Sequence, residues 1–224
     1  MSPAFSKKYP RARFLTGFTL AEMMTVTAIF LIMTAVVLGN LPEFSDRASL
    51  ELVAQEVSLV IRQAQSFGAN TRATLQEEGT EFPSYGIYFN LNDATSVFPS
   101  GTSFRLFADV DGNGRYSDSE ATTCATLDAE CREVFTLTGG LRIQDLRVCG
   151  QGCQVLTDDR SLNIVFARPN PEASFVDSDG VEDFPDCGAA CSHAIITLHS
   201  ARNNQTRDIC VWNTGHIYSK AECP

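Results

Sequence analysis

An apolar run near the N-terminus constrains this chain more than any other feature. From Phe18 to Leu41 the run holds 24 residues, and Glu22 is the only charged one among them. About 20 apolar residues in a helix span a lipid bilayer. Four basic residues precede the run and none follows it directly, which places the N-terminus in the cytoplasm. The run therefore predicts one membrane-spanning helix with the rest of the chain outside the cytoplasm.

Two common targeting segments share parts of this pattern. A secretory signal peptide has an apolar core of roughly 7–15 residues and then a small-residue cleavage site. This run is longer, and residues 38–42 at its far end do not form such a site. A simple signal anchor explains the length and the basic flank, but not Gly17, Phe18 or Glu22. A carboxylate inside an apolar helix is costly and usually marks function.

Residues 16–22, with the sequence TGFTLAE, resemble the N-terminus of type IV prepilins and type II secretion pseudopilins. The resemblance implies that a prepilin peptidase cleaves between Gly17 and Phe18, and that Phe18 is then N-methylated. It also implies that Glu22 pairs with the N-terminal amine of a neighbouring subunit as a filament assembles. A buried carboxylate needs a counter-charge, and the amine of a neighbouring subunit would supply one.

A helical pattern continues beyond the apolar run. Apolar residues recur there at alternating steps of three and four, with polar residues between them, which predicts an amphipathic helix. The apolar positions are Leu50, Val53, Val57, Val60, Ala64 and Phe67. We expect one helix from Phe18 to about Phe67, which Pro42 bends or interrupts and which Gly68 helps to end. A free coiled coil is the weaker alternative, since only about three heptads are present.

The remainder of the chain reads as β-structure. Runs rich in β-branched and aromatic residues alternate with turn-forming Gly, Asn, Asp and Pro. The predicted strands are Ser84–Phe89, Thr102–Phe107, Glu133–Leu137, Ser161–Phe166, Ala194–Leu198 and Arg207–Trp212. This length is enough for one domain with its own core.

The predicted fold class is α+β, with a long N-terminal helix packed on an antiparallel β-sheet, as the pilin resemblance implies. We divide the chain into a cleaved cytoplasmic leader at 1–17, a transmembrane or filament-core helix at 18–41, an amphipathic helix at 42–68 and a disulfide-rich β ectodomain at 69–224.

Three further segments resemble one branch of the family, the minor pseudopilins of the secretion "H" type and related minor pilins. They are residues 54–70, the Asp- and Gly-rich stretch Phe107–Tyr116, and the closing stretch Thr206–Ile217. Between Leu137 and Asp208 the sequence carries little of this resemblance. The branch implies a filament subunit at or near the tip, serving secretion, motility or DNA uptake.

The segment from Asp109 to Glu120 predicts a calcium site. Its residues at positions 1, 3, 5, 7, 9 and 12 follow the ligand pattern of an EF-hand loop, with Gly114 at the sharp turn. The predicted ligands are Asp109, Asp111, Asn113, the Arg115 carbonyl, Ser117 and Glu120. Strand-like residues precede the loop, so the ion would stiffen a β-hairpin. Ordinary turn chemistry is the alternative, and the acidic stretch Asp177–Asp183 fails the ligand pattern.

Eight cysteines follow the apolar run. An even number outside the cytoplasm favours disulfides, although sequence alone does not fix their pairing. We expect sequential pairing, with the last bridge pinning the C-terminal tail. The predicted pairs are Cys124–Cys131, Cys149–Cys153, Cys187–Cys191 and Cys210–Cys223. The alternative is a zinc site made by two Cys-x-x-x-Cys pairs with His193 or His199.

Charge and motifs narrow the function. The net charge is −10, and removal of a leader with four basic residues leaves 13 basic against 27 acidic residues, or −14. Because nucleic acids are bound by basic clusters, we expect no nucleic-acid partner. None of the three histidines lies in a catalytic motif and no phosphate loop is present, so we expect no enzymatic activity.

The sequence therefore predicts a minor pilin or pseudopilin. Its expected partners are other pilin subunits, the prepilin peptidase and the inner membrane. The expected location is the inner membrane, with a single span, before assembly into a pilus or pseudopilus. The alternative is a membrane-anchored, calcium-stabilised adhesion or recognition domain, which includes a minor pilin of DNA uptake.

Overall fold

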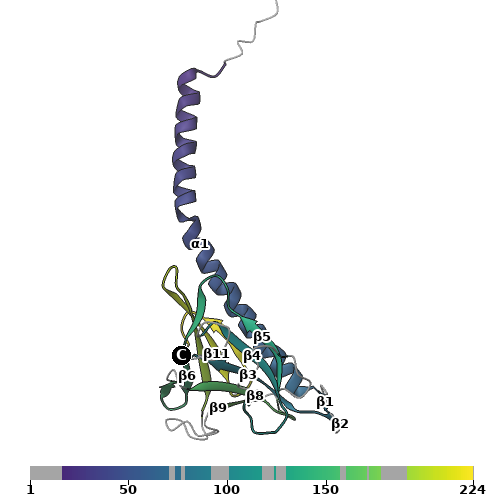
Figure 1. The fold of residues 1–224 in the computed structure, drawn as a ribbon. Coiled ribbons are helices and arrows are strands. Elements are labelled where there is room, and N and C mark those ends of the chain that lie inside the picture. The colour runs from purple at the N-terminus through teal and green to yellow at the C-terminus, as the bar shows by residue number, and fades with distance from the viewer. Residues whose placement is uncertain are drawn as a thin grey trace, which may run out of the picture. The chain divides into compact units, whose positions relative to one another are not determined.

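A computed structural model describes residues 17–70, 74–76, 79–91, 101–117, 124, 130–156, 160–170, 172–177 and 191–223. These residues form one helix and twelve strands, which gives an α+β fold (Figure 1). The chain divides into two compact units, Met1–Pro42 and Glu43–Pro224.

Helix α1 (Leu20–Ala69) begins with a local hydrogen-bonded cap. The Glu22 backbone N–H donates to the Thr19 hydroxyl at 3.2 Å, and the Thr19 backbone N–H donates to the Glu22 carboxylate at 3.2 Å. This reciprocal pair is a capping box, which satisfies two backbone donors that a helix start leaves open. The helix extends through Pro42 to Ala69, so the expected interruption does not occur, while the expected end near Gly68 does.

The first unit, Met1–Pro42, contains the apolar part of α1. This part is long and apolar enough to cross a membrane, with a mean hydropathy of 2.1 over its best window, and none of that window is buried. Most of its large side chains, including Leu20, Phe30 and Leu38, are more than half exposed, as is Phe18 just before it. Such a surface fits a single-pass membrane anchor.

The second unit contains two five-stranded antiparallel sheets, where a single sheet was expected. In one sheet the strand order is β5 (Cys131–Thr136), β4 (Ser103–Asp109), β3 (Ser84–Asn90), β8 (Ser161–Phe166), β9 (Ala173–Asp177). In the other the order is β12 (Ile217–Lys220), β11 (Gln205–Trp212), β10 (His193–Ser200), β6 (Leu141–Cys149), β7 (Cys153–Val155). A separate two-stranded ribbon joins β1 (Thr74–Gln76) and β2 (Gly79–Glu81).

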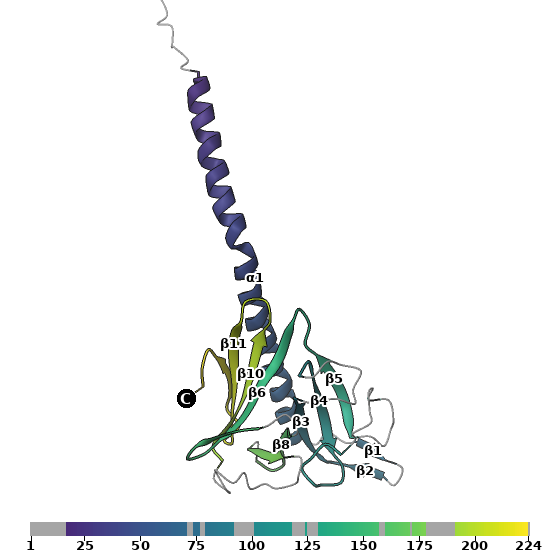
Figure 2. The ribbon, with the colours of Figure 1, turned by 60° about the vertical axis from the view of Figure 1, so that its left-hand side comes forward.

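The C-terminal part of α1 lies against these sheets and completes the core (Figure 2). Four positions of the predicted stripe are buried, and Val53 and Phe67 are partly buried and packed against them. The four buried positions are Leu50, Val57, Val60 and Ala64. The amphipathic helix is therefore confirmed.

Polar contacts also fasten this part of α1 to the edge of the second sheet. Arg62 donates to the Ile217 carbonyl at 2.8 Å, and Gln65 donates to the Gly215 carbonyl at 3.0 Å. Glu51 forms an ion pair with Arg207 of β11 at 2.6 Å. The helix position is thus set by hydrogen bonds as well as by apolar burial.

Candidate functional site

The N-terminal motif begins the apolar helix. Gly17 and Phe18 precede α1 and are exposed, and Glu22 is the acidic residue of its first turn. The Glu22 carboxylate also accepts a hydrogen bond from the Thr19 hydroxyl at 3.2 Å. Sequence reasoning had assigned Glu22 only a role toward a second subunit. The spacing Thr-x-x-Glu was the signal for its additional role as a helix cap.

Three carboxylates meet at the hairpin of β4 and β5. Asp109 is the last residue of β4, Asp111 lies in the turn that follows, and Glu130 directly precedes β5. One carboxylate oxygen from each residue lies within 4.8 Å of the other two. The Glu130 carbonyl accepts a hydrogen bond from the Ala108 backbone N–H at 2.9 Å, which fixes the backbone of Glu130 beside β4.

The turn after Asp109 is held by its own short polar side chains. The Asp111 carboxylate accepts the Asn113 backbone N–H at 3.1 Å, and the Asn113 side-chain oxygen accepts the Arg115 backbone N–H at 2.6 Å. Gly112 and Gly114 both have a φ of 73°, a conformation that glycine adopts without steric cost. The sequence DGNG is therefore explained in part by turn geometry.

Burial gives this cluster unusual electrostatics. Asp109 is 6% and Glu130 is 7% exposed. Burial raises the pKa of the Asp109 carboxyl, and the nearby Asp111 charge raises it further, against the lowering effect of the Gly114 backbone N–H. Burial likewise raises the pKa of Glu130, although its carboxylate accepts the Ser117 backbone N–H at 2.8 Å. The Oδ1 atom of Asp109 is buried and has no hydrogen-bond partner among the described residues.

The structure brings most of the predicted calcium ligands into one loop and adds one that was missed. Asp109, Asp111, Asn113, Arg115 and Ser117 all lie within the nine described residues 109–117. The predicted acid at the twelfth position, Glu120, lies outside the described residues. Glu130 was not predicted, because it lies far beyond the loop pattern. Its position next to Cys131, which is bonded to Cys124, was the available signal.

Disulfides account for the cysteines in the described part of the chain. The structure contains three of the predicted pairs, Cys124–Cys131, Cys149–Cys153 and Cys210–Cys223. Cys191 is also disulfide-bonded, and its predicted partner Cys187 lies outside the described residues.

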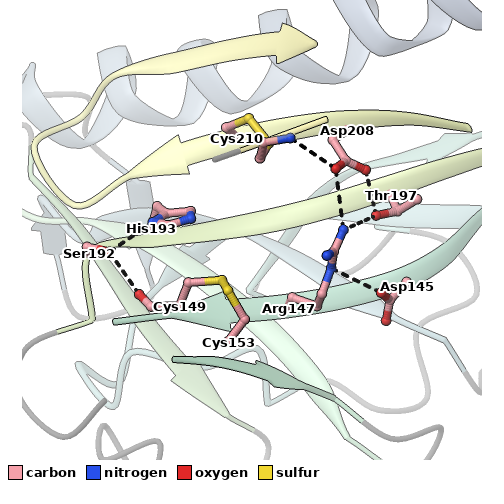
Figure 3. The surroundings of a disulfide bond; sticks show 10 residues. Asp145, Arg147, Cys149, Cys153, Ser192, His193, Thr197, Asp208 and Cys210 are labelled. Carbon is pink, nitrogen blue, oxygen red and sulfur yellow. Dashed lines mark hydrogen bonds and ion pairs between the residues drawn. A yellow bond between two sulfur atoms is a disulfide. The ribbon is translucent and has the colours of Figure 1, made fainter. Parts of the chain in front are cut away.

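The zinc alternative does not fit the second of these bridges. Cys149, Cys153 and His193 lie close enough to share an ion, but both sulfurs are already bonded to each other (Figure 3). A disulfide offers no thiolate, which is the form that binds zinc. His193 stacks on Trp212 with ring centroids 4.6 Å apart, and Ser192 donates to the Cys149 carbonyl at 3.0 Å. These contacts indicate a structural role for His193 and Ser192.

A polar network that sequence reasoning missed crosses the same sheet (Figure 3). The buried Asp208 carboxylate accepts hydrogen bonds from the Thr197 hydroxyl at 2.8 Å, from Arg147 at 3.3 Å and from the Cys223 backbone N–H at 3.2 Å. Arg147 also contacts Asp145 at 3.1 Å. The network links β6, β10 and β11 to the C-terminal tail, and a charged residue inside a predicted strand was its only signal.

Comparison with known proteins finds no matching family model, no matching curated protein and no matching solved structure.

Proposed function

We propose that this chain is a minor pilin or pseudopilin, a structural subunit of a type IV pilus-like or type II secretion filament. The observation that carries the proposal is Glu22, the single acidic residue in the first turn of an apolar helix, directly behind the Gly17–Phe18 bond. We further propose that prepilin peptidase cleaves this bond and methylates the new N-terminus.

The described hydrogen bonds of Glu22 are those of the capping box, and they bring it no counter-charge. Thr19 contributes a backbone N–H and a hydroxyl to the carboxylate, and both are neutral donors. An ionised carboxylate in a low-dielectric environment needs an opposite charge as well. After cleavage, the free amine of Phe18 on a neighbouring subunit would supply that charge.

The surface of α1 supports assembly in the same way. Its apolar side chains face outward in the single chain, with Phe30 68% and Leu31 67% exposed. Lipid covers such a surface before assembly, and the corresponding helices of other subunits would cover it in a filament. In this proposal the N-terminus is cytoplasmic, and the disulfide-bonded unit is extracytoplasmic.

The test replaces Glu22 in the native host in two ways. Glu22→Ala removes the charge and the cap, whereas Glu22→Gln removes the charge but keeps a capping residue. Glu56→Gln, an exposed position later on the same helix, is the control. Filaments sheared from the cells, or a pseudopilus fraction, are analysed by mass spectrometry for this chain and its N-terminal peptide.

We expect a methylated Phe18 peptide in the wild-type and Glu56→Gln fractions, and loss of the chain from filaments in both Glu22 variants. Normal assembly of Glu22→Gln would reduce Glu22 to a helix cap and remove the main support for the proposal. An uncleaved leader would contradict it directly. Cleaved protein that functions unassembled in the membrane would favour a membrane-anchored recognition domain instead.

A further inference from the structure

We propose that Asp109, Asp111 and Glu130 bind one calcium ion, which fastens the loop after β4 to the start of β5. This site is independent of the proposed filament function, because it lies wholly within the unit Glu43–Pro224. It also differs from an EF-hand pattern, since the closing acid is Glu130 in place of the twelfth loop residue, Glu120.

The spacing of the three carboxylates suits a shared cation. Calcium binds oxygen ligands at about 2.3–2.6 Å, so two oxygens on one ion are at most about 5 Å apart. One oxygen from each of Asp109, Asp111 and Glu130 already meets this condition, since all lie within 4.8 Å of one another. No large movement of the backbone is therefore needed to form the site.

A buried oxygen without a partner is the second, independent observation. Asp109 is only 6% exposed, and its Oδ1 atom accepts no hydrogen bond from the part of the chain that the structure describes. An unsatisfied buried acceptor costs roughly 1–3 kcal/mol, and more when it is charged. The donors described at the other two carboxylates are all neutral: the backbone N–H and side-chain amide of Asn113 and the Ser117 hydroxyl at Asp111, and the Ser117 backbone N–H at Glu130. A cation would satisfy Asp109 and offset the mutual repulsion of the three acids.

The ligand chemistry favours calcium. The cluster offers carboxylate oxygens only, with the Asn113 and Ser117 side chains next to it in the same loop. Zinc sites prefer sulfur and nitrogen ligands. Magnesium requires near-ideal octahedral geometry and tends to keep its waters, whereas calcium accepts irregular sets of six to eight oxygens from flexible loops.

The ion would connect two segments that are far apart in sequence. The loop is fixed on one side by the Tyr116 backbone N–H, which donates to Asn163 of β8 at 3.1 Å. Glu130 belongs to the other side, beside the Cys124–Cys131 disulfide. Binding would thus join β4, β5 and β8 through one loop, and it would raise the thermal stability of the protein.

The experiment measures calcium binding by the full chain in detergent micelles. The protein is stripped with a chelator, dialysed, and titrated with calcium chloride by calorimetry in excess magnesium. The melting temperature is recorded with and without calcium. The variants are Glu130→Gln, Asp111→Asn and Glu120→Gln. Glu133→Gln, an exposed acid on β5, is the matched control for charge.

We expect the wild type to bind one calcium ion with a Kd of about 0.1–1 mM, as in extracellular modules, and to melt at a higher temperature when it is bound. Glu130→Gln and Asp111→Asn should weaken binding at least tenfold and lose this rise, while Glu133→Gln should match the wild type. No binding by the wild type would overturn the proposal. Normal binding by Glu130→Gln together with lost binding by Glu120→Gln would overturn the assignment of Glu130.

Discussion

The buried carboxylates in the described part of the chain have two kinds of surroundings. Asp177 and Asp208 each contact an arginine, Arg160 at 2.8 Å and Arg147 at 3.3 Å respectively. Asp109 and Glu130 instead lie beside another acid, and their pKa values are raised by burial. Asp177 and Asp208 have a positively charged partner, whereas Asp109 and Glu130 have none among their described contacts. Removal of the acid therefore breaks an ion pair at the first kind of site and relieves repulsion at the second.

The raised pKa of Glu130 predicts how pH acts on the calcium-free protein. A carboxyl whose pKa is higher in the folded than in the unfolded state binds more protons when folded. Its contribution to stability is therefore present at low pH and is lost as pH rises above about 4 and through the folded pKa. Glu130→Gln cannot titrate, so its stability relative to the wild type should increase over this pH range.

This prediction is checked by chemical denaturation of both proteins in a chelator at several pH values. Glu133→Gln, on the exposed side of β5, provides the control and should show no such trend. A difference between Glu130→Gln and the wild type that stays constant or decreases with rising pH would contradict the electrostatic description of the cluster.

The Asp208 network predicts the opposite response to loss of an acid. Removing Asp208 leaves Arg147, the Thr197 hydroxyl and the Cys223 backbone N–H without a shared acceptor. Breaking a buried ion pair costs up to 3–5 kcal/mol, but Arg147 is 29% exposed and water can partly solvate it. We expect Asp208→Ala to lower the free energy of unfolding by about 1–3 kcal/mol, and Asp145→Ala to lower it by less than about 1 kcal/mol.

Between elements, α1 approaches the backbone of β8 closely at Gly68. A Cβ atom on Gly68 would lie 2.2 Å from the Phe166 carbonyl oxygen, which belongs to the backbone and cannot rotate away. The adjacent Phe67 packs on Tyr85 of β3 with ring centroids 5.4 Å apart. The last turn of α1 is therefore fitted to the first sheet at a position where only glycine has room.

Gly68→Ala tests this fit. Alanine normally stabilises a helix by about 1 kcal/mol relative to glycine. Here we expect the clash with Phe166 to reverse the sign and to lower the free energy of unfolding by about 1–3 kcal/mol. Gly152→Ala, where a Cβ meets no atom within 4 Å, is the control in a thermal or denaturant melt. Equal stability of Gly68→Ala and the wild type would show that α1 can shift away from β8.

Elements with a strong local pattern were predictable, and those with mixed polarity were not. The six predicted strands correspond to β3, β4, β5, β8, β10 and β11, and the stripe on α1 is correct. Strand β6 was missed because Arg142, Gln144, Asp145 and Arg147 interrupt its apolar positions. Its inward residues are identified only by pairing with β10. Strand β9 has five residues, and β1, β2 and β7 have three each, so these strands are too short to show a clear sequence pattern.

The residues of the candidate metal centre were likewise predictable only in part. A pattern read along the chain predicted Asp109, Asp111, Asn113 and Ser117 because these residues lie in one loop. Glu130 enters through the pairing of β4 with β5, which no spacing rule contains. The sequence pattern thus identified the residues of one loop, but it could not identify Glu130, which only the tertiary structure places beside them.

In the whole protein, the C-terminal tail is held both by a disulfide and by strand pairing. The Cys210–Cys223 bridge spans 13 residues and the Cys149–Cys153 bridge spans 4. Loop-closure entropy predicts a greater stabilisation from the longer span, about 3 against about 2 kcal/mol. The longer bridge also holds β12 beside β11, since both lie at this edge of the second sheet.

Replacement of each cysteine pair by serine checks this order. We expect the Cys210→Ser/Cys223→Ser protein to unfold at the lower temperature of the two variants, and its C-terminal residues to become the first site of limited proteolysis. The Cys149→Ser/Cys153→Ser protein is the matched comparison within the same sheet. A larger loss from the shorter bridge would show that strain or packing, and not loop entropy, controls the stability of this sheet.

The order of the strands along the chain has a consequence for how the protein acquires its shape during synthesis. The first sheet takes β3 to β5 and then β8 and β9, while the second takes β6 and β7 and then β10 to β12. Neither sheet is encoded by an uninterrupted stretch of sequence. A nascent chain that ends before residue 173 therefore lacks the last strand of the first sheet, and one that ends before residue 217 lacks the edge of the second. The first sheet therefore has all its strands once Asp177 has been made, whereas the second stays incomplete until Lys220, and a product that ends between these residues would have a complete first sheet and an incomplete second one.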